Sequence, residues 1–311
     1  MDQLHTSCGV ERAFFRNQRF TLAYTSRSME QKNNVIGQWS HSAPYWEKHR
    51  ETIRQMFAPI TEALINDAGI ARSHHVLDIG TGPGEPALGI AEWLGSEGTV
   101  IGVDPSPEMV DAAKRAADRL GRTNAEFRTA TADSLPFDAN TFDAIVSRFA
   151  VMFFPSPING LREMLRVLKP GGKLAVAVWH FAERNPFHYI FSQVVEAYVE
   201  STPPEPNAPD AFRFAETGKL RKILDEAGGS RSSERLLKFT IEAPLSLEEF
   251  WTLRSEMSDR LRTQMAKLTA EKVAEVRREV IETLKQYSTG STIRMPTEVV
   301  IVAAAKPSKI S

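Results

Sequence analysis

The feature that most constrains the fold is a short apolar run followed by three closely spaced glycines. Residues 75–79 are mostly apolar, and residues 80–84 read Gly-Thr-Gly-Pro-Gly. This pattern predicts a strand, a tight turn and a helix that begins at about Pro86. Glycines let the backbone turn sharply and let a ligand approach closely, although a purely structural turn would need them too.

Further strands and helices alternate after this turn. Apolar, β-branched runs predict strands, and Ser106-Pro107-Glu108 predicts the capped start of a helix between two of them. Strands that alternate with helices pair in parallel through right-handed crossovers, so we expect an α/β, doubly wound sheet covered on both faces. The predicted strands after the first are 99–103, 126–131, 142–147 and 173–179.

The two ends of the chain have different patterns. Residues 1–34 have no clear period and predict a poorly ordered arm, whereas residues 35–70 predict N-terminal helices that cover the sheet. We expect one domain over residues 35–311, with a cofactor-binding half over 75–180 and a substrate half over 181–311.

The substrate half contains a helical insertion. Residues 235–241 and 298–303 predict two late strands, and the charged residues 246–287 between them predict helices. An insertion at this place in the chain would lie over one end of the sheet as a lid. Two further predicted helices, 188–199 and 217–227, precede these strands.

Three carboxylates follow or flank the predicted strand ends and indicate the kind of ligand. Asp78 precedes the glycines, Asp104 ends the second strand and Asp133 follows the third. Asp104 stands where an acidic residue accepts hydrogen bonds from a ribose diol, although a turn residue beside a helix is the alternative. Three carboxylates would repel a pyrophosphate but suit a sulfonium, an ammonium, a ribose and an adenine amine, which together describe S-adenosylmethionine.

Composition and motif spacing argue against several other classes of protein. The formal net charge is −1, so no basic surplus favours a nucleic acid, and Cys8 is the single cysteine, which leaves no thiolate metal site or disulfide. No apolar run reaches the roughly 18 residues of a membrane span, and no secretory signal opens the chain. We therefore expect a cytoplasmic protein without a metal. The glycine spacing lacks a P-loop ending and disfavours a nicotinamide dehydrogenase.

Four segments together resemble a known family. They are Val76–Gly84, Val103–Ser106, Ala132–Phe137 and Leu165–Gly172. In order and spacing they resemble the class I S-adenosylmethionine-dependent methyltransferases, and most closely the type 11 group, which is similar to the ubiquinone/menaquinone biosynthesis methyltransferases. The resemblance covers about residues 35–180. It implies a Rossmann-like, mostly parallel, seven-stranded sheet and S-adenosyl-L-methionine as cofactor, with S-adenosyl-L-homocysteine as product.

The resemblance also implies roles for individual residues. Asp78 and the glycine backbone would hold the methionine moiety, Asp104 the ribose, and Asp133 the adenine amine. Met109 would pack on the adenine or in the core, and Arg148 would contact the methionine portion or a neighbouring acid. The cofactor-binding set is Tyr45, Asp78, Gly80, Thr81, Gly82, Pro83, Gly84, Asp104, Pro105, Met109, Ala132, Asp133, Ser134 and Arg148.

The acceptor and its activation are less constrained by the sequence. His180 follows the fifth strand and is the leading candidate for a catalytic base, ahead of His188 and His41, while some acceptors need no base. Aromatic residues that would cover the cofactor or line an acceptor pocket, or else pack in the core, are Tyr45, Trp46, Phe250 and Trp251.

We expect methyl transfer to oxygen, nitrogen or carbon of a small molecule, such as a quinone-like or other aromatic metabolite. Residues 147–150 read Ser-Arg-Phe-Ala and lack the Asn/Asp-Pro-Pro-Tyr/Phe segment of amino-directed DNA enzymes. A nucleic-acid or protein methyltransferase is the alternative, and a dehydrogenase or a non-catalytic binding module comes after it.

Overall fold

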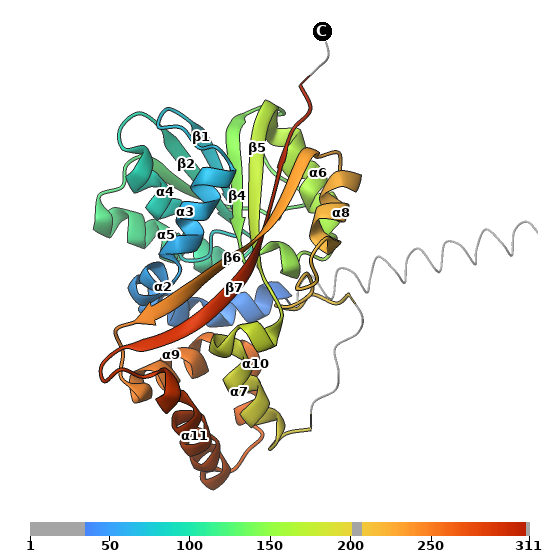
Figure 1. Cartoon of the computed structure of the whole chain (residues 1–311). Coiled ribbons are helices and arrows are strands. Elements are labelled where there is room, and N and C mark those ends of the chain that lie inside the picture. The colour runs from blue at the N-terminus through green and yellow to red at the C-terminus, as the bar shows by residue number, and fades with distance from the viewer. Residues whose placement is uncertain (1–34, 201–206, 309–311) are drawn as a thin grey trace, which may run out of the picture.

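The computed structural model describes residues 35–200 and 207–308. Seven strands form a single sheet in the order β3-β2-β1-β4-β5-β7-β6 (Figure 1). Strands β1 to β5 pair in parallel, and β7 is antiparallel to both of its neighbours. The strands are β1 (His75–Ile79), β2 (Thr99–Asp104), β3 (Ala125–Thr129), β4 (Phe142–Arg148), β5 (Leu168–Trp179), β6 (Ser230–Ala243) and β7 (Ile293–Ala305). The predicted α/β, mostly parallel, seven-stranded sheet is confirmed.

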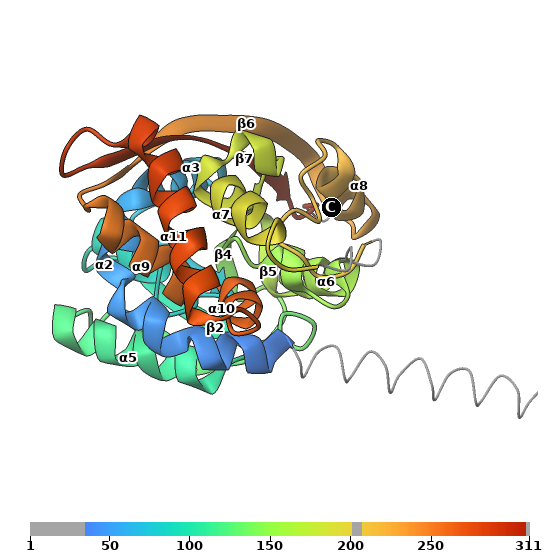
Figure 2. The same cartoon turned by 90° about the horizontal axis from the view of Figure 1, so that it is seen from below.

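Helices cover both faces of this sheet. The described helices are a first helix over residues 35–48, α2 (Arg50–Met56), α3 (Ala58–Asp67), α4 (Ala87–Leu94), α5 (Pro107–Leu120), α6 (Pro157–Val167), α7 (Pro186–Glu196), α8 (Lys219–Glu226), α9 (Leu247–Met257), α10 (Asp259–Met265) and α11 (Ala270–Leu284), with short 3-10 turns η1 (Val151–Phe153), η2 (Ala182–Arg184) and η3 (Lys285–Tyr287). Helices α3 and α4 lie together on one face, and α6 and α8 lie together on the other (Figures 1 and 2). This arrangement buries the central parallel strands on both sides.

Helix α5 begins where its sequence predicts. The Ser106 hydroxyl accepts a hydrogen bond from the backbone N–H of Met109, and Pro107 occupies the first turn. Gly121 ends the helix at φ 62°, a left-handed conformation that favours glycine. The helix start lies beside the carboxyl end of β2, where the Ser106 N–H donates to Asp104.

The two late strands are longer than the sequence predicts. Strands β6 and β7 pair from Ala243 opposite Ile293 to Ser230 opposite Ala305, well beyond the predicted 235–241 and 298–303. The start of β6 reads Ser-Arg-Ser-Ser-Glu and has no apolar alternation, so its backbone pairing leaves no hydrophobic signal. Strand β5 likewise begins at Leu168, before the predicted 173.

A layer of helices lies beyond the carboxyl ends of the parallel strands. The insertion between β6 and β7 forms α9, α10 and α11, which lie near α7 and the first described helix, residues 35–48 (Figure 2). A complete capping box between Ser246 and Glu249 starts α9, and the hydroxyls of Ser258 and Thr269 cap α10 and α11. The predicted helices between the last two strands are therefore present.

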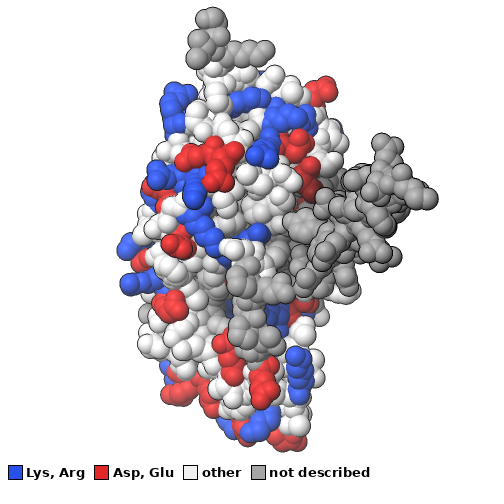
Figure 3. Space-filling view, turned by 90° about the vertical axis from the view of Figure 1, so that its right-hand side faces the viewer, with Lys and Arg blue, Asp and Glu red and all other residues white. Residues whose placement is uncertain are grey.

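Three expectations concern the N-terminal arm, membrane-spanning helices and the distribution of charge. The predicted arm over residues 1–34, with Cys8, lies outside the described residues. None of the helices in the described ranges is long and apolar enough to cross a membrane. Lys and Arg side chains mix with Asp and Glu over the face shown in Figure 3, where no single sign dominates.

Candidate functional site

The glycine loop forms one wall of a deep pocket at the carboxyl ends of β1, β2 and β4. Gly80, Gly82 and Gly84 have φ values of 73°, 53° and 102°, conformations that side chains rarely adopt. A Cβ on Gly80 would lie 2.2 Å from the Cβ of Ala150, whereas a Cβ on Gly82 would meet no atom within 4 Å. Gly80 therefore permits close packing inside the protein, and Gly82 borders open space in the pocket.

Asp104 lies across from this loop at the end of β2. Its Oδ2 accepts a hydrogen bond from the Gly82 N–H, and its Oδ1 accepts one from the Ser106 N–H, both at 3.0 Å. The side chain lines the pocket although it is largely buried, and burial raises its pKa to about 6. The carboxylate is thus held in a fixed orientation, with lone pairs left to accept further hydrogen bonds.

A group of buried charges lies on the other side of the loop. Glu85 Oε1 pairs with Arg50 Nη1 at 2.9 Å, but the buried Oε2 of Glu85 has no hydrogen-bond partner among the described residues. Asp78 accepts one hydrogen bond from the Ala87 N–H, and its buried Oδ1 is likewise unpartnered in the described chain. Burial raises the pKa of Asp78 to about 7 and also raises that of Glu85.

Arg148 adds a buried cation to the same group. Its Nη1 donates to the Thr61 hydroxyl at 3.1 Å, and its guanidinium lies 5.8 Å from the centre of the Phe57 ring. Burial lowers the pKa of Arg148, while the negative charges of Glu85 and then Asp78 oppose that change. The pocket therefore offers both an unpartnered carboxylate oxygen and a guanidinium at one place.

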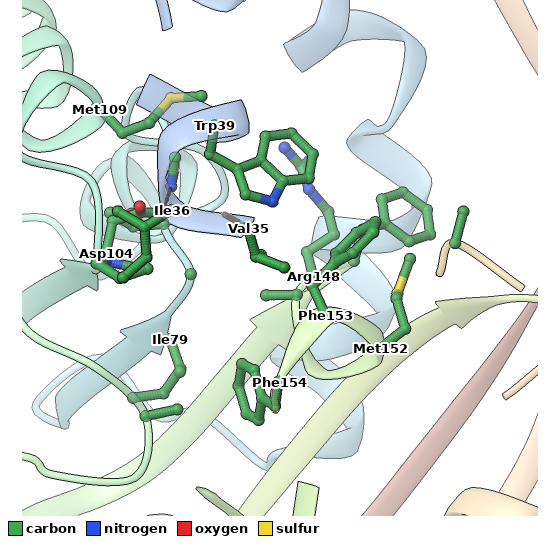
Figure 4. A pocket seen from close by; sticks show the side chains of 18 of the residues that line it. Val35, Ile36, Trp39, Ile79, Asp104, Met109, Arg148, Met152, Phe153 and Phe154 are labelled. Atoms are coloured by element: carbon green, nitrogen blue, oxygen red, sulfur yellow. Dashed lines mark hydrogen bonds between the residues drawn. The ribbon is translucent and has the colours of Figure 1, made fainter. Parts of the chain in front are cut away.

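The first described helix closes the pocket from above. In Figure 4 this helix crosses the pocket, with Asp104 and Met109 to one side of it and Arg148 to the other. Its side chains in the wall are Val35, Ile36, Trp39 and Trp46. The aromatic cover that the sequence predicts is present here, but it comes from Trp39 and Trp46, because the Tyr45 ring lies instead against the guanidinium of Arg262 at 4.7 Å.

The far half of the pocket is aromatic. Phe149 and Trp179 stack with ring centres 4.0 Å apart and planes 7° apart, and Phe57 meets both rings edge-on. Phe149 takes a positive φ of 60°, which is unusual for a bulky residue and places its ring in this stack. Phe187 of α7 completes this aromatic wall.

Most residues of the predicted cofactor set lie together in the pocket wall. These are Gly80, Thr81, Gly82, Pro83, Asp104, Pro105, Met109, Ala132, Asp133 and Arg148. Asp78 and Gly84 are buried and lie outside the wall, and a Cβ on Gly84 would lie 2.7 Å from Leu88. Ser134 hydrogen-bonds back to Thr131 and lies outside the wall.

The candidates for a base are placed differently from the prediction. His180 Nδ1 lies 3.0 Å from Glu298 Oε2, and His180 is outside the pocket wall. Of the two weaker candidates, His188 lines the pocket and His41 does not. Phe250 is buried against Phe187 and Phe191 rather than in the wall, and Trp251 stacks on Phe191.

Sequence reasoning did not find Glu85 and Arg254. Glu85 directly follows the glycine loop, and a carboxylate one residue past the motif is a local signal that was available. Arg254 lies four residues after the buried Phe250 on the same face of α9, so a lone arginine at an inward helical position was the available signal.

Comparisons with known proteins agree with this geometry. A family model described as a methyltransferase domain matches residues 76–172. The uncharacterized methyltransferase YcgJ of Bacillus subtilis is 38% identical over 123 residues, which cover 40% of this chain and 47% of YcgJ. Demethylmenaquinone methyltransferase of Shouchella clausii is 32% identical over 209 residues, which cover 63% of this chain and 80% of that relative. The solved structure of YcgJ shares the fold, with a TM-score of 0.51 at 22% identity over 79% of this chain and 97% of YcgJ.

The fold and the loop define a Rossmann-like domain with a pocket at the carboxyl ends of its parallel strands. The chain belongs to the family of S-adenosylmethionine-dependent methyltransferases, which includes the demethylmenaquinone methyltransferases. S-Adenosylmethionine is the cofactor of this family. The chain spans about half the length of several curated relatives, 47% of YcgJ and 55% of the aklanonic acid methyltransferase DauC.

Proposed function

We propose that this protein transfers the methyl group of S-adenosylmethionine to a small, planar, largely apolar acceptor. The observation that carries this proposal is a single pocket with two chemically different halves. One half holds the glycine loop, Asp104 and Glu85, and the other is walled by Phe149 and Trp179. The polar half suits a charged nucleoside, and the aromatic half suits a flat molecule. The two halves meet at the loop.

The residues of the polar half fit the cofactor. The unpartnered Oε2 of Glu85 would accept from the ammonium of the methionine moiety, and Arg148 would pair with its carboxylate. Asp78 is fully buried and does not line the pocket, so it would support the loop rather than contact the ligand directly. The open space at Gly82 leaves room for the ligand against the loop backbone.

The nucleoside would lie toward β2 and the segment after β3. Asp104 would accept hydrogen bonds from the ribose hydroxyls, since its two oxygens are already oriented by the N–H groups of Gly82 and Ser106. The adenine would lie among Met109, Ala132 and Asp133, all of which line the pocket.

The bound sulfonium supplies a methyl group that is already activated toward a nucleophile. The task of the protein is then to align the acceptor and to exclude water. Trp39 and Trp46 cover the cofactor half, and Phe57 lies between the two halves, in edge contact with Phe149 and Trp179. No step of this arrangement requires His180, which pairs with Glu298 away from the pocket.

A small-molecule acceptor is supported by the enclosure of the aromatic half. Its walls come from the strand ends, α7 and α9, and Trp179, Phe187 and Arg254 in these walls are each at most 5% exposed, which suits a small ligand better than a polymer. The demethylmenaquinone methyltransferase of Shouchella clausii, by its name, acts on a quinone-type ring. A flat ring system is the kind of molecule that Phe149 and Trp179 would stack on.

Calorimetry with S-adenosylhomocysteine tests the cofactor half. Wild-type protein is expected to bind it, and Asp104→Asn is expected to bind at least about tenfold more weakly because it loses charge-assisted hydrogen bonds. Asp111→Asn, an exposed residue on α5, is the matched control and should bind normally. Unchanged affinity of the Asp104 variant would remove the ribose assignment.

Transfer of a radiolabelled methyl group tests the acceptor half. The protein is incubated with labelled S-adenosylmethionine and an extract of the source cells, and the products are partitioned. Label in the low-mass, organic-soluble fraction is expected. Label in precipitable protein or nucleic acid would overturn the small-molecule acceptor and support the alternative class.

A further inference from the structure

Arg254 is a buried cation in the acceptor half of the pocket. It projects from α9, is only 5% exposed, and lines the pocket together with His188 of α7. Its Nε donates to the backbone carbonyl of Phe187 at 2.9 Å, and its guanidinium lies 4.1 Å from the centre of the Phe187 ring. Burial lowers the pKa of Arg254 to about 9, which still leaves the group protonated at neutral pH.

No counter-ion accompanies this charge within the described ranges. Arg50, which is buried behind the pocket wall, pairs with Glu85 at 2.9 Å, whereas no ion pair of Arg254 is found among residues 35–200 and 207–308. Its Nη1 also makes no hydrogen bond to those residues. A buried, unpaired guanidinium is costly, and an anion from outside the chain would offset that cost.

His188 places a second donor beside it. Arg254 Nη2 lies 3.4 Å from His188 Nδ1, and a guanidinium can only donate, so Nδ1 accepts and the ring hydrogen is on Nε2. That Nε2 is buried and has no partner in the described chain. Burial, and then the positive charge of Arg254, lower the pKa of His188 well below its usual range, so the ring stays a neutral N–H donor.

The surroundings of these donors are aromatic. The His188 ring meets Trp179 edge-on with centres 4.5 Å apart, and Trp179 stacks on Phe149. A ligand that reaches Arg254 therefore lies between flat apolar surfaces, which favour a planar ring. The two requirements together describe an aromatic compound that carries an anionic oxygen.

We propose that Arg254 and His188 form an oxyanion site that anchors a carboxylate or phenolate of an aromatic methyl acceptor. This inference rests on the proposed methyltransferase function, whose acceptor class it specifies. Both donors share the pocket with the glycine loop, so an acceptor anchored by its anionic oxygen would present the remainder of its ring toward the cofactor half.

A pair of probes of equal shape tests the site by calorimetry. 2-Naphthoate carries the oxyanion, and 2-naphthamide is its neutral counterpart. The protein loaded with S-adenosylhomocysteine is expected to bind naphthoate at least about tenfold more tightly than naphthamide, as expected for a desolvated charge pair. Equal affinities, or no binding of naphthoate at millimolar concentration, would overturn the proposal.

Variants test whether Arg254 and His188 cause the preference for naphthoate over naphthamide. Arg254→Met replaces the apolar stem of the arginine with an unbranched apolar side chain and removes the charge, so it should bring the two affinities within about threefold. Arg254→Lys should retain part of the preference. His188→Phe keeps an aromatic ring at this position but removes the N–H donor, so it should lose part of the preference for naphthoate. Arg260→Gln, an exposed position on α10 that pairs with Glu196, is the control and should behave as wild type. An Arg254→Met protein with the full wild-type preference would remove Arg254 from the site.

The test separates this inference from the proposed function. Binding of S-adenosylhomocysteine is measured first, and its failure counts against the cofactor site alone. The comparison of naphthoate with naphthamide is also run without S-adenosylhomocysteine and decides the oxyanion site in either case. Should Arg254→Met fail to fold, as judged by circular dichroism, Arg254→Lys and His188→Phe decide the assignment.

Discussion

The indole Nε1 of Trp46 donates a hydrogen bond to the backbone carbonyl of Met257 at 3.2 Å, although 211 residues separate them. The bond joins the first described helix to the end of α9, and both residues line the pocket. Glu256, the next residue back, pairs with Lys48 at 2.8 Å and lies 2.6 Å from His49. The cover over the cofactor half is therefore fastened to the insertion over the acceptor half.

Loss of the Glu256 contacts to Lys48 and His49 should speed release of the ligand more than it destabilises the fold. Glu256→Gln removes the ion pairs of a partly exposed carboxylate, so we expect a loss of less than about 1 kcal/mol in the free energy of unfolding. Dissociation of S-adenosylhomocysteine, followed by stopped-flow tryptophan fluorescence, should become several-fold faster. Glu51→Gln breaks a pair with Arg54 within α2 and should leave that rate unchanged. Equal rates in both variants would show that the contact does not retain the ligand.

Two glycines of the loop should respond differently to alanine. Gly80→Ala would place a Cβ 2.2 Å from Ala150 at φ 73°, so we expect a loss of several kcal/mol in the free energy of unfolding or failure to fold. Gly82→Ala meets no atom within 4 Å and carries only the cost of its positive φ, about 1 kcal/mol. Denaturant unfolding measures both changes.

Gly82→Ala should nevertheless bind S-adenosylhomocysteine poorly, because its new methyl group occupies space at the pocket wall. A folded Gly82→Ala protein with wild-type affinity would place the ligand away from the loop.

Glu85 and Asp104 should affect different parts of the cofactor. Glu85→Gln should weaken S-adenosylhomocysteine binding about tenfold or more but leave 5′-methylthioadenosine unaffected, because that nucleoside lacks the amino acid. Asp104→Asn should weaken both ligands. Glutamine can still accept from Arg50, which limits the loss of stability. Equal weakening of both ligands by Glu85→Gln would contradict the ammonium assignment.

The affinity for the nucleoside should rise with pH near 6. Burial raises the pKa of Asp104 from about 4 to about 6, so the folded protein holds this proton more tightly than the unfolded chain. The contribution of Asp104 to stability is therefore greatest below pH 4 and is lost as the pH rises through 6. The pH dependence of ribose binding is opposite to that of stability, because binding requires the ionised carboxylate. Affinity for 5′-methylthioadenosine should increase between pH 5 and pH 7, measured by calorimetry, and Asp104→Asn should show no such increase.

Much of the cofactor half could be predicted from the sequence because its signals are local. The strand, the three glycines and Asp104 each lie in a short segment whose pattern fixes its own conformation, and α5 begins and ends at its own caps. Strands β1, β2 and β4 were located to within about a residue because buried parallel strands are continuous apolar runs.

The predictions that differ from the structure have a common physical reason, which is a contact with a distant segment. The polar start of β6 is held by pairing with β7, and no periodicity within β6 records its partner. His180 stands at the end of β5 as predicted, but Glu298 of β7 holds its ring outside the pocket wall. Tyr45 and Trp46 are neighbours on one helix, and only packing against α9 and α10 decides which of them faces the pocket.

The sequence by itself determined the α/β alternation, the glycine loop and the carboxylate at the end of β2, since each depends on residues close together in the chain. The tertiary structure alone decided that Glu85 meets Arg50, that Trp46 meets Met257, and that Arg254 meets His188 across 66 residues. Burial and pairing of charges depend on which distant segments pack together, and a local pattern does not contain that information.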